Sequence, residues 1–184
     1  MAERRLAGAF VDFARSVRAW GVLVAQRRLT SPKKWVGIGL RFEDGTSPFI
    51  FRETALREAR TEDPAVLVIQ FRVAVLGSSQ YLHAAFRREC ALHTPLFAGF
   101  PGFRSKLWAD DVNTGVYEWQ SASLATQYAQ RMVGLLAPFS NPGTARYHVI
   151  EHLRRNDFLS DRGAARDSSA SGWWQLAEAP TGIP

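Results

Sequence analysis

The sequence contains a single cysteine, Cys90, so no disulfide can form within the chain. It also lacks any apolar run of the roughly 18–20 residues that a helix needs to cross a bilayer. The first residues form neither a hydrophobic segment nor a small-residue cleavage site, so we predict no signal peptide. Together these absences predict a protein of the reducing cytoplasm.

Motifs of several enzyme classes are absent as well. There is no phosphate-binding loop and no Gly-x-Ser-x-Gly nucleophile turn. The pair Gly37 and Gly39 lacks the third glycine and the following helix of a dinucleotide loop. His148 and His152 alternate with Glu151 along a predicted strand, which places Glu151 on the other face. We therefore predict no metal site.

The chain is basic, with a net charge of +6 and a sequence pI of about 10.1. Basic proteins often bind nucleic acid or anionic membranes. Here the basic residues gather toward the two ends of the chain, and the centre is mixed in sign. Helix-turn-helix, zinc-finger and aromatic RNA-binding motifs are missing, so we predict no nucleic-acid partner.

A helix is predicted over residues 3–29, because apolar residues recur there at spacings of three and four. The stripe indicates a helix that packs on the domain or on a partner chain. A cationic amphipathic segment that rests on a membrane surface is the alternative. The stripe consists of Leu6, Phe10, Phe13, Val17, Trp20 and Val24.

Proline and turn residues divide the chain into three parts. Pro32 ends the first helix, and Trp35 to Phe42 is then predicted to be a strand that pairs with Phe49 to Arg52 in a hairpin. A polar linker over 53–62 completes an N-terminal extension, residues 1–64. The main domain follows over 65–153. Residues 154–184 are predicted to be a mobile tail because they offer little to bury, although Trp173 and Trp174 should dock on something.

The main domain has the pattern strand, helix, strand, turn, strand, helix, strand. This order predicts an α+β fold, a ferredoxin-like βαββαβ unit with both helices on one face of an antiparallel sheet. The other sheet face then needs a cover, which predicts a homodimer. The predicted elements are strands Val66 to Val75, Gly102 to Trp108, Val116 to Gln120 and Ala145 to His152, with helices Ser79 to Leu96 and Ser123 to Leu136.

Alternation within the strands assigns side chains to the two faces of the sheet. Leu67 and Ile69 should face the helices. Lys106 and Trp108 share one face of the second strand, and Tyr117 and Trp119 share one face of the third.

The stretch 66–152 resembles a known superfamily. It carries Pro101-Gly102-Phe103, a strand ending in Leu107-Trp108, an Asp/Asn-Gly turn, Gly115-Val116-Tyr117-Glu118-Trp119 and then Ser121-Ala122-Ser123-Leu124-Ala125. This series looks like the antibiotic-biosynthesis-monooxygenase-like, dimeric α/β-barrel superfamily, and within it the YdhR-like monooxygenases.

The resemblance implies a dimeric barrel with a ligand pocket between sheet and helices in each subunit. Some members of the superfamily oxidise electron-rich aromatic polyketides without metal or flavin, and others cyclise polyketides, degrade haem or isomerise lactones. It therefore implies a small-molecule enzyme, a cofactor-independent monooxygenase or a cyclase, with a hydrophobic aromatic or polyketide-like substrate. A non-catalytic ligand-binding or interaction protein that uses the same pocket is the alternative.

Cofactor-free chemistry needs a base, donors that hold the substrate anion and apolar walls that exclude water. His93 and His83 on the first predicted helix are the candidate catalytic residues, because histidine titrates near neutral pH. Aromatic side chains and one arginine are the candidate substrate-binding residues: Phe86, Trp108, Tyr117, Trp119, Tyr128 and Arg72.

Overall fold

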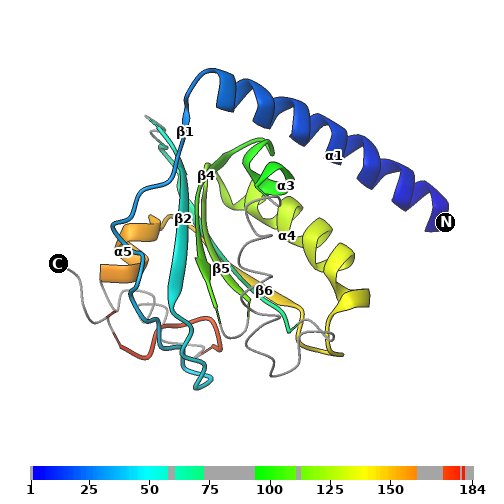
Figure 1. Cartoon of the computed structure of the whole chain (residues 1–184). Coiled ribbons are helices and arrows are strands. Elements are labelled where there is room, and N and C mark those ends of the chain that lie inside the picture. The colour runs from blue at the N-terminus through cyan, green and yellow to red at the C-terminus, as the bar shows by residue number, and fades with distance from the viewer. Residues whose placement is uncertain are drawn as a thin grey trace.

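The fold is built on one six-stranded sheet, seen edge-on in Figure 1. The computed structural model describes residues 2–57, 61–72, 94–110, 113–160, 172–178 and 180; residues 2–13, 96, 136 and 139 are described by their backbone alone. In the order β1-β2-β4-β5-β3-β6, every neighbouring pair is antiparallel. The strands are β1 (Leu29–Thr30), β2 (Ile50–Leu56), β3 (Ala65–Gln70), β4 (Phe103–Ala109), β5 (Thr114–Trp119) and β6 (Arg146–Ile150).

Four of these strands confirm the predicted ferredoxin-like α+β unit. β3, β4, β5 and β6 follow each other in the chain but lie in the spatial order β4-β5-β3-β6, which is the order of a split βαβ. Helix α4 (Ala122–Leu136) connects β5 to β6, and its first turn is capped by the Ser121 hydroxyl, which accepts from the Leu124 amide at 3.4 Å. Most of the predicted helix Ser79 to Leu96 lies outside the described residues, and its last two residues begin the short helix α3 (Pro95–Ala98).

One face of the sheet is covered by helices. Figure 1 shows α4, α3 and the long helix α1 (Ala2–Ala25) on this side. As alternation predicts, Leu67 and Ile69 of β3 point to this face, where they pack in one core cluster with Ala125 and Tyr128 of α4. We refer to this side as the helix face.

The opposite face of the sheet is covered by the same chain. Residues 35–50, helix α5 (Arg155–Ser160) and residues 174–176 pack on it (Figure 1). The cover buries Val66, Val68, Leu107 and Val116 completely. An uncovered sheet face was the physical reason to predict a dimer, and this reason does not hold for the folded chain. The predicted homodimer stays a prediction that needs another surface.

The hairpin predicted in the N-terminal extension takes a different form. Residues 35–42 are not a regular strand, because Gly37 turns the chain with φ +91° and only isolated bridges join Gly39 to Phe49 and Phe42 to Leu176. β2 continues to Leu56 and pairs with β4, so part of the predicted polar linker is a sheet strand.

The predicted mobile tail also differs from the structure where residues are described. Arg155–Ser160 form helix α5, and Phe158 and Leu159 are fully buried. Trp174 docks as expected, on this chain's own sheet, and its side chain is 8% exposed. Residues 161–171 lie outside the described part of the chain.

Candidate ligand site

Four predicted substrate-binding aromatics meet on the helix face. Tyr128 of α4 lies against Trp119 with ring centroids 4.8 Å apart and against Tyr117 at 5.5 Å. Trp108 of β4 joins them through Phe97 of α3, at 5.3 Å. Trp119 and Tyr128 are 0% and 1% exposed, so these two fill the core behind the others.

The two tyrosines form a polar contact inside this apolar cluster. Burial, the nearby Tyr117 and a hydrogen bond between the two hydroxyls raise the pKa of Tyr128 well above its ordinary value. Tyr128 therefore stays a neutral phenol near neutral pH. The pair can orient a hydroxyl at the back of a ligand site, but Tyr128 cannot act as a base near neutral pH.

A buried lysine lies beside these rings. Lys106 of β4 is 6% exposed, and its Nζ lies 3.1 Å from the ring centroid of Trp108, 4.6 Å from that of Phe97 and 4.8 Å from that of Tyr117. An ammonium over aromatic faces is attracted by their negative π-clouds, more strongly when water is excluded. The sheet therefore presents a cation inside an aromatic cluster.

Lys106 lines a hollow at one end of the sheet. The space accessible to a water-sized molecule is about 40 Å³, and the hollow with its open mouth measures about 330 Å³. The inner space holds about one water molecule, so a larger ligand would place one polar group there and its rings in the mouth. The main side chains around the hollow are Phe51, Ile69, Phe71, Lys106, Trp108 and Tyr117.

Backbone features of β4 and β5 position this site. Trp108 pairs with Gly115 on the neighbouring strand. A Cβ on Gly115 would lie 2.5 Å from Cε2 of Tyr117, so only glycine leaves room for the Tyr117 ring there. A register shift between Phe103 and Ser105 brings Phe103 onto the helix face together with Lys106 and Trp108, which strict alternation does not predict.

Arg72 does not line this hollow. It belongs to a second hollow of about 280 Å³ that shares Phe71 with the first and is lined by Asp44, Gln70 and Arg146. The Arg72 amide donates to the Thr144 hydroxyl at 3.2 Å, and its carbonyl accepts from the Asn141 amide at 2.8 Å.

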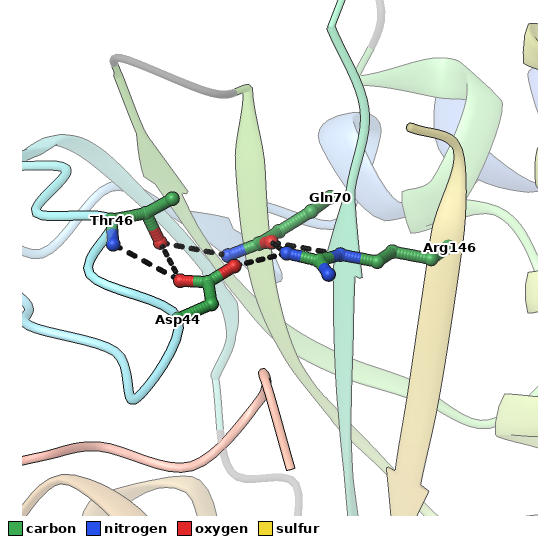
Figure 2. A network of polar contacts seen from close by, with 4 residues as sticks. All are labelled: Asp44, Thr46, Gln70 and Arg146. Atoms are coloured by element: carbon green, nitrogen blue, oxygen red, sulfur yellow. Dashed lines mark hydrogen bonds and ion pairs between the residues drawn. The ribbon is translucent and has the colours of Figure 1, made fainter. Parts of the chain in front are cut away.

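Four polar side chains of the second hollow bond to one another, namely Asp44, Thr46, Gln70 and Arg146 (Figure 2). Arg146 donates to the Gln70 side-chain oxygen at 2.7 Å and forms an ion pair with Asp44. Thr46 donates its hydroxyl to Asp44 at 2.7 Å and accepts from the Gln70 amide at 3.4 Å. Burial would raise the pKa of Asp44, but hydrogen bonds from Thr46 and the Arg146 charge lower it. The network holds the 43–47 turn against β3 and β6.

Three predicted residues cannot be placed. His93, His83 and Phe86 lie outside the described residues, so their roles remain predictions. Lys106 was not among the predicted ligand residues, although its two-residue spacing from Trp108 puts both side chains on one strand face. The spacing indicated that Lys106 and Trp108 share a strand face, but it did not indicate that the lysine would be buried among aromatic rings.

Neither metal binding nor a membrane span is indicated where residues are described. No group of three or more His, Cys, Asp or Glu in that part of the chain could hold a metal ion. No helix there is both long and apolar enough to cross a bilayer.

Comparisons with known proteins give weak likenesses to solved structures. No protein-family model and no curated protein matches the chain. An uncharacterized ferredoxin-fold protein from Listeria monocytogenes, related to antibiotic biosynthesis monooxygenases, is 10% identical with a TM-score of 0.37, and covers 61% of this chain and 68% of its own.

Two further structures are similar to the same degree. A monooxygenase-like protein from Listeria innocua is 13% identical with a TM-score of 0.33, covering 62% of this chain and 68% of its own. A heme-degrading enzyme from Listeria monocytogenes is 11% identical with a TM-score of 0.37, covering 68% of this chain and 97% of its own. Likenesses at this level carry no inference about activity, substrate or cofactor.

Proposed function

We propose that this protein is a small-molecule enzyme whose hydrophobic, aromatic or polyketide-like substrate presents an anionic oxygen to Lys106. The observation that carries the proposal is the buried Lys106 ammonium among the rings of Trp108, Phe97 and Tyr117. Such a site complements an aromatic anion, because the rings stack on the ligand while the cation holds its charge.

The proposed chemistry is cofactor-independent monooxygenation or cyclisation, as the sequence resemblance implies. Both begin with loss of a proton from an acidic carbon or hydroxyl of the substrate, and both gain from stabilisation of the resulting anion in a site that excludes water. Lys106 supplies that stabilisation. His93 and His83 are the proposed bases. In the oxygenation the substrate anion itself reacts with dioxygen, so that a CH2 group becomes a carbonyl with one oxygen atom and the other oxygen atom leaves with the two hydrogens as water.

A pair of fluorescent probes tests the binding step. 1-Anilinonaphthalene-8-sulfonate is an aromatic anion, and N-phenyl-1-naphthylamine is a neutral compound with the same ring system. We expect Lys106→Met to weaken binding of the anion about ten-fold or more, the loss typical of a hydrogen bond to a charged group. Binding of the neutral probe should stay within about two-fold of wild type, because the variant keeps the aromatic walls.

Two matched variants make the binding test specific. Lys106→Arg keeps the cation and should retain preference for the anion, while Lys34→Met removes an exposed lysine elsewhere and should change nothing. Circular dichroism of each variant verifies the fold. Equal loss of both probes in a folded Lys106→Met protein, or no loss of either, would contradict the proposed role of Lys106.

Oxygen uptake separates the enzyme from the non-catalytic alternative. With 1,8-dihydroxyanthrone as substrate, we expect protein-dependent consumption of dioxygen that falls at least about ten-fold in Lys106→Met, since the substrate anion loses its counter-charge. Cyclisation is followed by mass spectrometry of a poly-β-ketone analogue. Tight binding of aromatic anions with neither reaction would refute catalysis and leave a ligand-binding protein.

A further inference from the structure

The charge of this chain is concentrated in one segment. Residues 1–34 contain eight of the 23 Lys and Arg residues and two of the 17 Asp and Glu residues, so the whole net charge of +6 falls there. Residues 15–36, which we name the basic segment, contain six basic residues and no acidic one. The remaining 150 residues are balanced in sign.

The basic side chains of this segment all face solvent. Each of them is exposed, and none forms an ion pair with another described residue. Lys34 lies over the Trp35 ring with Nζ 5.0 Å from its centroid, which still leaves its charge available to a partner. The six are Arg15, Arg18, Arg27, Arg28, Lys33 and Lys34.

Apolar side chains are exposed within the same segment. Val22, Val24 and Val36 are 49%, 45% and 39% exposed, and they are three of the five large hydrophobic residues so exposed in the described part of the chain. Exposed valines between arginines do not serve solubility. A helix that combines basic residues with accessible apolar ones is typical of attachment to a bilayer interface.

Helix α1 contacts the rest of the domain through few residues, which leaves the basic side chains and valines of the basic segment exposed to solvent. The Ser16 hydroxyl donates to the Pro95 carbonyl, and Gly99 of the same region has its Cα so close that a Cβ would lie 1.9 Å from the Ser16 carbonyl oxygen. Trp20, one turn later, packs on the aromatic core cluster. In Figure 1, α1 extends past α4 toward its N-terminus, away from the sheet.

An amphiphilic hollow opens beside this anchor. It measures about 370 Å³ and lies between α1 and α4, with Arg15 and Arg131 among its lining residues and Phe100 and Leu124 as apolar walls. This combination suits an anionic headgroup that carries an acyl chain.

We propose that the basic segment docks this protein on a bilayer that contains anionic phospholipids, with α1 lying along the surface. Positive charge complements the headgroups, the exposed valines enter the interface, and the hollow at Arg15 receives one lipid. Nucleic acid would match the charge but not the exposed valines. The proposed attachment is peripheral, with α1 at the level of the headgroups.

Sedimentation of the full chain with vesicles tests the proposal. Vesicles of phosphatidylcholine with about 30 mol % phosphatidylserine should carry the protein down, and pure phosphatidylcholine vesicles should not. About 0.5 M salt should release much of the bound protein, because it screens the charges.

Matched variants assign the binding to the basic segment. Each basic residue near an anionic surface contributes about five-fold to affinity, so Arg27→Gln with Arg28→Gln should weaken binding about 25-fold. The pair Arg41→Gln and Arg154→Gln removes the same charge elsewhere and should have little effect. Val22→Ser with Val24→Ser should weaken binding about ten-fold without any change in net charge.

Several results would overturn the proposal. One is the absence of sedimentation with phosphatidylserine vesicles, and another is an equal loss in the two arginine pairs, which would indicate a net-charge effect only. Binding to double-stranded DNA that is tighter than to vesicles and insensitive to the valine substitutions would assign the segment to nucleic acid. Self-association that depends on the same valines without lipid would assign it to a second copy of the chain.

Discussion

At the scale of single residues, a buried ion pair joins the two extensions of the domain. Arg155 of α5 donates to Glu53 of β2 at 2.6 Å, and their side chains are 8% and 3% exposed. The Arg155 Nε and Nη1 atoms and the second Glu53 oxygen have no hydrogen-bond partner among the described residues. Burial of incompletely satisfied charges is costly, so each partner depends on the other.

Removing one member of this pair should therefore cost more than removing both. We expect Arg155→Leu to lower the free energy of unfolding by about 3–5 kcal/mol, because it leaves the Glu53 carboxylate buried and uncompensated. The double variant Glu53→Leu with Arg155→Leu should recover much of this loss. Urea unfolding of the two single variants and the double variant measures the coupling, and additive losses would show that the two residues act independently.

His148 gives the protein a dependence on acid. Its ring stacks on Trp174 with centroids 4.0 Å apart, and burial lowers the pKa of His148 below the ordinary 6.5. As the pH falls, the unfolded chain therefore binds a proton at His148 before the folded chain does. The contribution of His148 to stability is complete above about pH 6.5 and is lost as the pH falls through its lowered folded value. His148→Phe keeps a stacked ring without a titrating group.

We accordingly expect the melting temperature of the wild type to fall between pH 7.5 and pH 5 by more than that of His148→Phe. Thermal unfolding followed by circular dichroism at several pH values provides the comparison. A control is Asp44, whose lowered pKa affects stability only in more acidic solution, below about its ordinary 3.8. Parallel curves for wild type and His148→Phe would rule out a role for His148 in the acid response.

Sequence patterns predicted some of these residues well and missed others for a physical reason. Alternation placed Lys106 and Trp108 on one face of their strand, and Tyr117 and Trp119 on one face of theirs, because strand geometry alone decides it. It did not predict that both pairs share the helix face, which follows from how the strands pair. Glu53 appeared as part of a polar linker, since nothing local shows that Arg155, about a hundred residues later, neutralises it. Burial of a charged residue depends on partners that are distant in the sequence, and the residues next to it in the sequence do not reveal them.

At the scale of elements, the contact of α1 with α3 depends on one glycine. A Cβ on Gly99 would lie 1.9 Å from the Ser16 carbonyl oxygen, and a backbone atom cannot yield as a side chain can. We expect Gly99→Ala to separate α1 from α3, which should speed hydrogen exchange of the α1 amides while the sheet stays protected.

Another glycine of the same contact region provides the matched control. Gly21 lies on α1 itself, and a Cβ there would meet nothing within 4 Å. Gly21→Ala should leave the exchange of α1 unchanged or slow it, since alanine favours the helix. Equal exchange rates in the Gly99→Ala variant and the wild type would show that α1 is held by other contacts.

The ferredoxin-like elements were predictable from sequence, and the additions to them were not. Each predicted strand of the main domain overlaps an observed one, because period-two patterns and turn residues are local signals. The pairing of β2 with β4 was missed, since the Asp44-Gly45 turn suggested a hairpin within the extension. Which strand joins a sheet edge is decided by packing over long distances.

At the scale of the whole molecule, the cover on the second sheet face changes what a dimer would require. Association through this face would need residues 35–50, α5 and residues 174–176 to leave it. Because Trp174 is largely buried in the cover, we expect Trp174→Ala to lower the free energy of unfolding by about 3 kcal/mol.

The same substitution tests where a homodimer forms. We expect light scattering to give the same molar mass for Trp174→Ala and for wild type, whatever that mass is, because any dimer must use another surface. Leu135→Ala, which shortens an exposed side chain, is the control for non-specific effects. A change of mass in Trp174→Ala alone would place the interface on the covered face after all.

The cover also has a consequence for the order in which the molecule is made. Backbone hydrogen bonds within the cover join segments that are far apart in the sequence. The Glu43 amide donates to the Gln175 carbonyl at 2.9 Å, and the Ala177 amide donates to the Arg41 carbonyl at 2.8 Å. Residues 174–176 leave the ribosome after every strand of the sheet. Until then only residues 35–50 and α5 are available to cover the apolar face of the finished sheet, so the newly made chain should need a chaperone most just before this short segment emerges.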